Sequence, residues 1–335
     1  MILAGDIGGT KTLLGLFEQR HGQLACIARE TYPSAGFGSF TALLTEFLGR
    51  HPADTLQAAC IGVAGPIVAG DCEATNLPWS LTRKTIGGLL GITQIRLIND
   101  LEAAAWGILD LSDDQLVDLN PAADAGQPGN IGIIAAGTGL GEAILYWDGV
   151  NYHALATEGG HTDFGPNDDR EAALLAWLRR QYNGHVSYER LVSGMGLVNI
   201  YRFLLSTGEI PENPETARRM QVQDPAAVIG ETALSGNDAL CAEALHLFCR
   251  IYGAEAGNLA LNCLPYAGLY LVGGIAGKIL PCLQQGEFMA RFLDKGRYAA
   301  LLKKIPVRVC LNPDVALEGA ASFAGTMIRD NERKT

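Results

Sequence analysis

The feature that most constrains the fold is a short pattern that occurs twice. Residues 2–19 have the sequence ILAGDIGGTKTLLGLFEQ, and residues 130–150 have the sequence NIGIIAAGTGLGEAILYWDGV. Each copy has an apolar run, a turn of Gly and Thr, and a second apolar run, so each predicts a β-hairpin. A dinucleotide-binding or P-loop motif leads from its glycines into a helix, which does not fit here. The repeat therefore predicts two halves of similar layout.

Length and composition indicate a folded protein with two domains. The chain has 335 residues, of which 48% are hydrophobic and 18% charged, and this length exceeds what one core usually supports. The polar segment 111–128 loses the periodicity of its neighbours, so we place the domain boundary there. No apolar run reaches the length of a membrane span, and MILAGDIGG does not resemble a secretory signal. We expect a cytoplasmic protein with no membrane segment.

Charge and cysteine content exclude further classes. The net charge is −11 and Lys and Arg cluster only in pairs, so we expect no nucleic-acid partner. Acidity does not prevent phosphate binding, because backbone N–H groups can bind phosphate. The eight cysteines form no CxxC pair, which is typical of buried free thiols in a reducing compartment.

The pattern between the hairpins predicts a mixture of strands and helices. Strands are expected to alternate with helices up to residue 109, and the second half is expected to be mostly helical. A polar surface loop is expected over 206–225, and a frayed tail over 329–335. Ser80 is expected to cap the second helix. The predicted helices cover residues 38–50, 80–91, 101–109, 169–181, 188–205, 238–262, 275–280 and 315–328.

Three glycine turns predict a nucleotide site. A glycine turn can point successive N–H groups into a concavity that suits phosphate oxygens. A plain hairpin turn is the alternative for any one of them alone, but two turns in matching positions and a third after the run GLYLV favour a nucleotide. The residues concerned are Gly8, Gly9, Thr10, Gly137, Thr138, Gly139, Gly273 and Gly274.

Two carboxylates follow apolar runs. Asp6 ends the first run and Asp100 ends the run QIRLIN. Because ligands of open α/β sheets bind beyond the carboxyl ends of strands, both carboxylates are expected at one site. One of them can hold hydrated Mg²⁺ and the other can accept a proton from an attacking hydroxyl. The alternative for Asp100 is a helix N-cap, although such a cap does not explain the amide of Asn99.

The segment TEGGHTDFGPN leaves three alternatives open. Glu158, His161 and Asp163 lie within six residues, around Gly159 and Gly160. This composition fits a metal site, a general acid/base pair or a turn with polar caps. The glycines indicate a tight bend or a close approach to another group.

Seven motifs together resemble the bacterial glucokinase family, a branch of the sugar kinase/Hsp70/actin ATPase superfamily. They occur in the family's order and separations, from about Leu3 to Ala324. The motifs are GDIGGT, IND, GTGLG, EGGHTDF, GHVSYERLVSGMGLVNIY, GNLALN and LVGGI. The resemblance implies a two-lobed actin-like ATPase fold of the α/β class (ribonuclease H-like), with a mixed sheet in each lobe and a ligand cleft between them. It implies a small lobe over 1–111 completed by a C-terminal helix over 315–330, a large lobe over 112–314, and a homodimer.

The resemblance also implies roles for single residues. It implies phosphorylation of glucose to glucose 6-phosphate by ATP and Mg²⁺, with Asp100 as the general base. The segments Asp6–Thr10 and Gly137–Gly141 would bind phosphates, Gly273 and Gly274 adenosine, and Asp6 would hold Mg²⁺ through water. The implied hexose ligands are Asn99, Asp100, Glu158, His161 and Glu189. Asp163 is expected to fix its loop, and Thr75 and Asn76 to line the sugar side of the site.

Other functions remain as alternatives at this point. They are a kinase of mannose or fructose, and a non-catalytic sugar-sensing regulator of the same fold. An actin- or Hsp70-type ATPase would lack the EGGH and Glu189 segments. At position 11 this chain has Lys, where the glucokinase family more often has Asn. A Lys at this position resembles a related family of repressors and kinases, but members of that family usually have zinc-binding cysteines shortly after the histidine. Here no cysteine lies between Cys72 and Cys241, and five residues before Asp6 leave no room for a helix-turn-helix.

Overall fold

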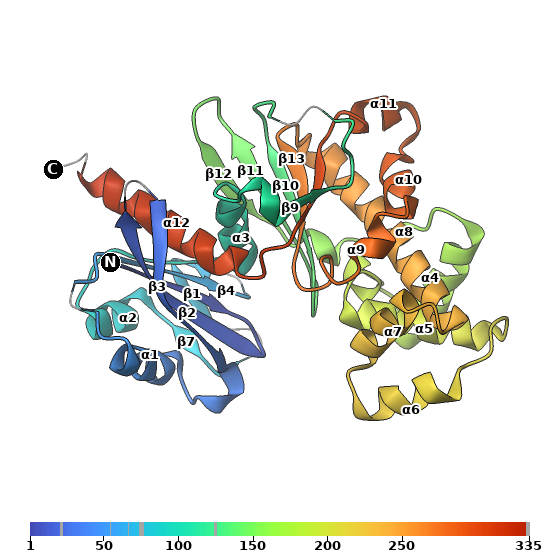
Figure 1. The fold of residues 1–335 in the computed structure, drawn as a ribbon, viewed down its shortest axis with the longest axis horizontal. Coiled ribbons are helices and arrows are strands. Elements are labelled where there is room, and N and C mark those ends of the chain that lie inside the picture. Colours follow the sequence, from blue (N-terminus) through green and yellow to red (C-terminus); the bar gives the residue numbers. More distant parts are fainter. Residues whose placement is uncertain (21–22, 54, 66, 74–76, 124–125, 333–335) are drawn as a thin grey trace. The chain divides into compact units, whose positions relative to one another are not determined.

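The chain forms two compact units, each of which is described by itself. The computed structural model describes residues 1–20, 23–53, 55–65, 67–73, 77–123 and 126–332 (Figure 1). Unit 1 comprises residues 1–112 and the segment from residue 312 onward, and unit 2 comprises residues 113–311. Within the described ranges, no helix combines the length and the apolar character that crossing a bilayer requires.

Unit 1 contains a mixed sheet of five strands in the order β3-β2-β1-β4-β8. The first three strands form an antiparallel meander, and the last two run parallel to β1. The strands are β1 (Ile2–Ile7), β2 (Lys11–Arg20), β3 (Gln23–Pro33), β4 (Ala58–Val63) and β8 (Ile95–Asn99). The predicted first hairpin is therefore confirmed. A smaller sheet contains β5 (Ile67–Val68), β6 (Asp71–Glu73) and β7 (Ser80–Leu81).

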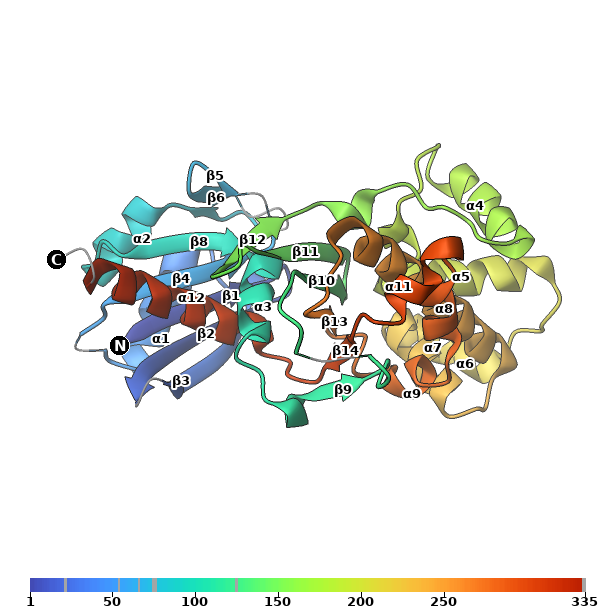
Figure 2. The same ribbon diagram turned by 90° about the horizontal axis from the view of Figure 1, so that it is seen from above.

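Helices cover both faces of this sheet. On one face lie α1 (Phe40–Arg50) and α2 (Arg83–Leu90), and on the other α3 (Asp100–Ile108) and the C-terminal α12 (Val315–Glu332). The last two pack side by side, as Figure 2 shows. Their close approach depends on glycine, because a Cβ on Gly319 would lie 1.9 Å from the carbonyl oxygen of Ala103. The end of the chain thus completes the core of unit 1.

Unit 2 repeats the same arrangement of strands. Its sheet has the order β12-β11-β10-β13-β14-β9, with an antiparallel meander followed by two strands parallel to β10. The strands are β10 (Ile131–Ala136), β11 (Leu140–Trp147), β12 (Tyr152–Ala156), β13 (Gly268–Val272), β14 (Val307–Cys310) and β9 (Leu116–Asp118). The second hairpin is confirmed as predicted. The edge strand β9 was not expected, since it lies in the polar segment 111–128.

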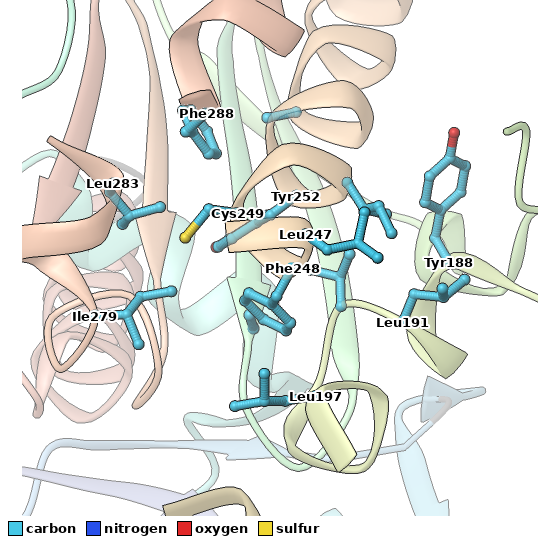
Figure 3. Close-up of a cluster of buried hydrophobic side chains, with 14 of the residues drawn as sticks. Tyr188, Leu191, Leu197, Leu247, Phe248, Cys249, Tyr252, Ile279, Leu283 and Phe288 are labelled. Atoms are coloured by element: carbon cyan, nitrogen blue, oxygen red, sulfur yellow. The ribbon is translucent and has the colours of Figure 1, made fainter. Parts of the chain in front are cut away.

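The core of unit 2 is built around one long buried helix of 25 residues, α8 (Ala239–Cys263). Figure 3 shows Phe248 and Tyr252 of α8 in this core, together with Leu283 and Phe288 from two later helices. Backbone contact is close here, because a Cβ on Gly253 would lie 2.1 Å from the carbonyl oxygen of Phe288. The helices of the unit are α4 (Asp169–Gln181), α5 (Gly194–Thr207), α6 (Pro214–Val222), α7 (Pro225–Leu234), α8 (Ala239–Cys263), α9 (Leu280–Leu283), α10 (Glu287–Leu293) and α11 (Ala299–Leu302).

Five predictions of local structure were wrong. Residues 206–225 contain α6 and the start of α7, because Asn213 and Asp224 cap helices whose first residues are prolines. Residues 188–193 form a 3₁₀ turn and a loop before α5, and residues 275–279 form turns before α9. Ser80 lies in β7, and Thr82 caps α2 by accepting from the N–H of Thr85. The last helix continues to Glu332 instead of fraying after residue 328.

Candidate active site

Two carboxylates of unit 1 lie together where β1 and β8 end. Asp6 pairs in register with Gly62 of β4, and Asp100 is the first residue of α3. A Cβ on Gly62 would lie 3.0 Å from Cβ of Ala103 and 3.6 Å from Cα of Asp100, so glycine lets α3 begin close to the sheet. Burial first, and then the charge of Asp100, raise the pKa of Asp6 to about 6, while Lys11 opposes the shift.

The start of α3 bears on the N-cap alternative for Asp100. Asn99 is the N-cap, and its Oδ1 accepts from the N–H of Leu101 at 2.9 Å. The Oδ1 of Asp100 accepts from the same N–H, also at 2.9 Å. The alternative that Asp100 is the N-cap is therefore not what the structure shows, because Asn99 holds that position, and the role of Asp100 as general base stays a prediction.

The first glycine turn is stabilised by hydrogen bonds from Ser34, a residue that the sequence analysis did not identify. The N–H of Gly8 donates to the carbonyl of Lys11 at 3.0 Å, which closes the turn. Ser34, buried just after β3, donates its N–H to the carbonyl of Thr10 at 3.0 Å and its hydroxyl to that of Gly8 at 2.8 Å. Gly9 and Thr10 are left exposed at the tip. No local pattern marks Ser34, because its partners lie in the hairpin that precedes it.

The second glycine turn is joined to two other predicted segments. The N–H of Gly194, at the start of α5, donates to the carbonyl of Gly137 at 2.8 Å. The N–H of Ile275 donates to the carbonyl of Ala136 at 3.2 Å. Gly273 has a φ of +89°, and a Cβ there would lie 2.7 Å from the same carbonyl oxygen, so this position needs glycine. Unit 2 therefore brings the turns 137–139 and 273–274 together.

A cavity of about 840 Å³ opens beside these turns, entirely within unit 2. This volume lies in the usual range for small-molecule sites. Its walls are mostly apolar, with Asp224, Glu231 and Lys278 as charged groups. The lining residues include Gly137, Thr138, Gly194, Val198, Ala226, Ala227, Gly230, Gly274, Ile275 and Ile279.

The Glu158–His161 loop packs against the segment that contains Glu189. Residues Gly159–His161 form a 3₁₀ turn, and both Glu158 and His161 are exposed. The chain then runs antiparallel to residues 186–188, where the N–H of Tyr188 donates to the carbonyl of Thr162 at 3.1 Å. A Cβ on Gly160 would lie 2.0 Å from the carbonyl oxygen of Leu140, which explains this glycine. Three predicted hexose ligands therefore come from adjacent segments.

Glu189 links this loop region to the second glycine turn. Its Oε2 accepts from the N–H of Leu140 at 3.1 Å, and a Cβ on Gly139 would lie 2.4 Å from the same oxygen. Asp163 contacts Nδ1 of His185 at 2.9 Å, and Nε2 of His185 lies 3.2 Å from the carbonyl oxygen of His161. These contacts fit the expected loop-fixing role of Asp163.

The other sequence-based expectations concern cysteines, metals and two loop residues. All eight cysteines are free thiols; seven are buried as expected, and Cys26 is exposed. In the part of the chain that the structure describes, no three His, Cys, Asp or Glu side chains are placed to hold a metal ion together. Thr75 and Asn76 lie outside the described residues. Asp6, Asn99 and Asp100 belong to unit 1, whereas Glu158, His161, Glu189 and the cavity belong to unit 2.

Comparison with known proteins gives a consistent result over nearly the whole chain. The glucokinase family model matches residues 3–327. A glucokinase of Nostoc punctiforme is 44% identical over 98% of this chain and 99% of its own length. The crystal structure of a glucokinase from an Antarctic psychrotroph has 30% identity and a TM-score of 0.83, and covers 97% of this chain and 98% of its own.

A more distant structure shares the fold. It is a ROK family glucokinase from Streptomyces griseus in complex with glucose and AMPPNP, with 21% identity, a TM-score of 0.66, and coverage of 97% of this chain and 99% of its own. The predicted fold class, α/β with a mixed sheet in each of two parts, is confirmed by these structures and by the two sheets described above. The family match and the full-length relatives show that the chain belongs to the glucokinase family and is a hexokinase-type glucose kinase.

Proposed function

We propose that the protein transfers the γ-phosphoryl group of MgATP to the 6-hydroxyl of glucose, with Asp100 as the general base. The observation that carries this proposal is the pair of carboxylates, Asp6 and Asp100, where β1 and β8 end. Phosphoryl transfer requires an acceptor oxygen in line with the phosphorus and a group ready to take its proton. Asp100 is the first residue of α3, directly after β8, and its carboxylate is the candidate for that second role.

The sugar is assigned to Asn99, Asp100, Glu158, His161 and Glu189. Carboxylates accept hydrogen bonds from neighbouring hydroxyls of a pyranose, and an imidazole can donate or accept. Glu158 and His161 are exposed on one loop, and Glu189 comes from the segment that packs against it. This grouping within unit 2 supports a hexose ligand set rather than a metal site.

The nucleotide is assigned to the cavity of unit 2 and to the glycine turns. The cavity has the size and the apolar walls that suit adenosine, with Gly274 at its edge. The turns Gly8–Thr10 and Gly137–Gly139 would bind phosphates through backbone N–H groups. The AMPPNP complex of the Streptomyces griseus relative supports ATP as the donor.

Asp6 is the residue that would hold Mg²⁺ through water. Its carboxylate is held near that of Asp100, and the resulting concentration of negative charge favours a hard divalent cation with oxygen ligands. When bound, Mg²⁺ would neutralise charge on the transferring phosphate. We also propose a homodimer, which the family resemblance supports, and a cytoplasmic location.

The test is a hexose panel with MgATP and a measurement of ADP release. A polar site rejects an analogue that leaves its groups unpaired, so glucose should be used far better than galactose, whose 4-hydroxyl is inverted. Equal rates with both sugars would contradict the assignment to glucose. A higher kcat/KM for mannose or fructose would reassign the substrate.

A further inference from the structure

A pair of buried carboxyl groups in unit 2 has no role in the proposed chemistry. Glu142 of β11 and Glu255 of α8 are 5% and 3% exposed, and their side chains are hydrogen-bonded to each other. A hydrogen bond between two carboxyl groups requires that one of them carries a proton. Burial first, and then the neighbouring Glu255, raise the pKa of Glu142 to about 8. At neutral pH the pair therefore holds one proton.

The two carboxyl groups differ in how they are held. The amide of Asn258 donates to Oε2 of Glu255 at 2.8 Å and to the hydroxyl oxygen of Tyr188 at 3.1 Å. Lys295 donates to Oδ1 of Asn258 at 2.6 Å and fixes the orientation of this amide. By contrast, Oε1 of Glu142 is buried without a hydrogen-bond partner among the described residues. Glu142 is therefore the less firmly held member of the pair.

Glu142 lies directly under the loop that bears Glu158 and His161. A Cβ on Gly159 would lie 2.1 Å from Oε2 of Glu142 and 2.9 Å from its Cδ. The hydroxyl of Thr157 donates to the carbonyl of Glu142 at 3.0 Å and accepts from the N–H of Gly159 at 3.1 Å. The carboxyl group of Glu142 therefore lies in contact with the loop at Gly159, where no side chain would fit between them.

The same network reaches the second sugar-binding segment. Tyr188 immediately precedes Glu189, and its hydroxyl accepts from Asn258 at 3.1 Å. Figure 3 shows Tyr188 beside Leu191, with its hydroxyl directed away from the labelled apolar side chains. The buried pair is thus connected to both segments that carry the proposed hexose ligands of unit 2.

We propose that Glu142 and Glu255 are positioning residues for the sugar: the proton that they share holds the 158–161 loop and the Tyr188–Glu189 segment in place, and its loss weakens glucose binding. This inference rests on the proposed role of Glu158, His161 and Glu189 as hexose ligands. When both carboxyl groups are ionised, two like charges repel each other in a site with little solvent. The side chain of Glu142 has fewer hydrogen bonds than that of Glu255, so Glu142 moves and displaces the loop of residues 158–161.

Other titratable groups face the pair from the surrounding elements. Burial raises the pKa of Tyr188 and of Cys263 to about 12, and it also raises the pKa of Tyr252, so these three stay neutral up to pH 9. Burial lowers the pKa of Lys295, and the carboxylate of Glu255 opposes that shift. Glu171 of α4 acts on both Tyr188 and Lys295. A variant of Glu142 separates titration of the pair from titration of Lys295.

The first experiment measures the glucose KM and kcat between pH 7 and pH 9. If glucose binds the protonated pair, a pKa of about 8 raises KM by about tenfold over this range. The kcat should change far less, because saturating glucose keeps the pair protonated. In Glu142→Gln the amide donates to Glu255 in place of the proton, so KM should stay nearly flat. Glu243→Gln, which removes a carboxylate of α8 outside the network, should keep the parent's rise.

A second experiment uses calorimetry of glucose binding in buffers of different ionisation enthalpy. At pH 9 the parent should take up about one proton per glucose, and Glu142→Gln should take up close to none. Glu255→Gln, which keeps the hydrogen bond in the opposite direction, should behave as Glu142→Gln does, and thermal unfolding checks that both variants are folded.

Three results would overturn the inference. The first is a glucose KM of the parent that stays constant up to pH 9. The second is a rise of the glucose KM with pH that persists in both Gln variants, which would assign the rise to Lys295. The third is proton uptake on glucose binding that is the same in the variants as in the parent. Failure of both Gln variants to fold, with no proton uptake by the parent, would also contradict it. An enzyme that does not phosphorylate glucose at pH 7 would contradict the proposed function instead.

Discussion

The two units use the same five-strand arrangement but have different residues at the ends of the strands. In unit 1 the order is β3-β2-β1-β4-β8, and in unit 2 the corresponding strands are β12-β11-β10-β13-β14. Where unit 1 pairs Asp6 with Gly62, unit 2 pairs Ala135 with Val272. The acid of the first hairpin is therefore replaced by an apolar residue in the second. A sheet of one topology acts as a scaffold, and the residues at its strand ends decide what the site can do.

The position of the carboxyl pairs extends this comparison. Unit 1 holds Asp6 and Asp100 at strand ends, where a substrate or a metal ion can approach. Unit 2 holds Glu142 and Glu255 between its sheet and α8, with almost no exposure. The first pair is proposed to act in proton transfer and cation binding, and the second, which has almost no exposure, is proposed to position its neighbours.

The largest expected effect follows from Asp100→Asn. Asparagine keeps the size and the hydrogen bond to Leu101 but cannot accept the proton, so kcat should fall by about 10²–10⁴-fold. Because Asn99 caps α3, thermal stability should stay near that of the parent. Glu102→Gln, in the first turn of the same helix, is the matched control and should keep most of the activity. If kcat of Asp100→Asn stays within a few-fold of the parent, Asp100 is not the general base, and unit 1 no longer differs from unit 2 in having a catalytic carboxylate.

Asp6→Asn should have the next largest effect. A group that orients a metal ion through water typically contributes about 10–100-fold in activity, so kcat should fall by that amount and more Mg²⁺ should be needed for half-maximal rate. Glucose binding, measured by calorimetry, should change little. An unchanged Mg²⁺ requirement would argue that Asp6 has no part in metal binding.

Two glycines of the second turn should respond in opposite ways. Gly139→Ala places a Cβ against Oε2 of Glu189, so it should displace this ligand and raise the glucose KM by about tenfold or more. A Cβ on Gly137 meets nothing within 4 Å, so Gly137→Ala should leave glucose binding intact and raise mainly the KM for ATP. Steady-state kinetics with each substrate varied distinguishes them. A higher KM for ATP in Gly139→Ala, or a higher KM for glucose in Gly137→Ala, would contradict this assignment of the two glycines.

The smallest effect concerns stability. The pKa of Glu142 is raised from 4.5 to about 8 in the folded protein, so the folded state binds more protons than the unfolded state between these values. Its contribution to stability is therefore present below about pH 4.5 and declines as pH rises to about 8. Glu142→Gln should stabilise the protein more at pH 8.5 than at pH 5.5, as measured by urea denaturation. A constant difference would argue against the shared proton.

Much of the fold follows from local patterns in the sequence. The two hairpins were predicted because alternating apolar residues and glycine turns specify backbone conformation within a few residues. Helix α4 covers the predicted residues 169–181, since Asp168 caps it and the last turn is basic. The motifs that carry the family resemblance are also short, and the family assignment is confirmed. By contrast, α6 was missed because its polar composition outweighed the cap at Asn213.

The positions of the chemical groups relative to one another required the tertiary structure. By itself the sequence determined the repeated hairpins, the glycine turns and the identity of the candidate ligands, because these depend on residues that are neighbours in the chain. Only the tertiary structure showed that Ser34 supports the first turn, that β9 pairs with β14, and that Glu142 meets Glu255 beneath the loop of residues 158–161. Those contacts join residues far apart in sequence, and the packing of helices on each sheet decides which of them meet.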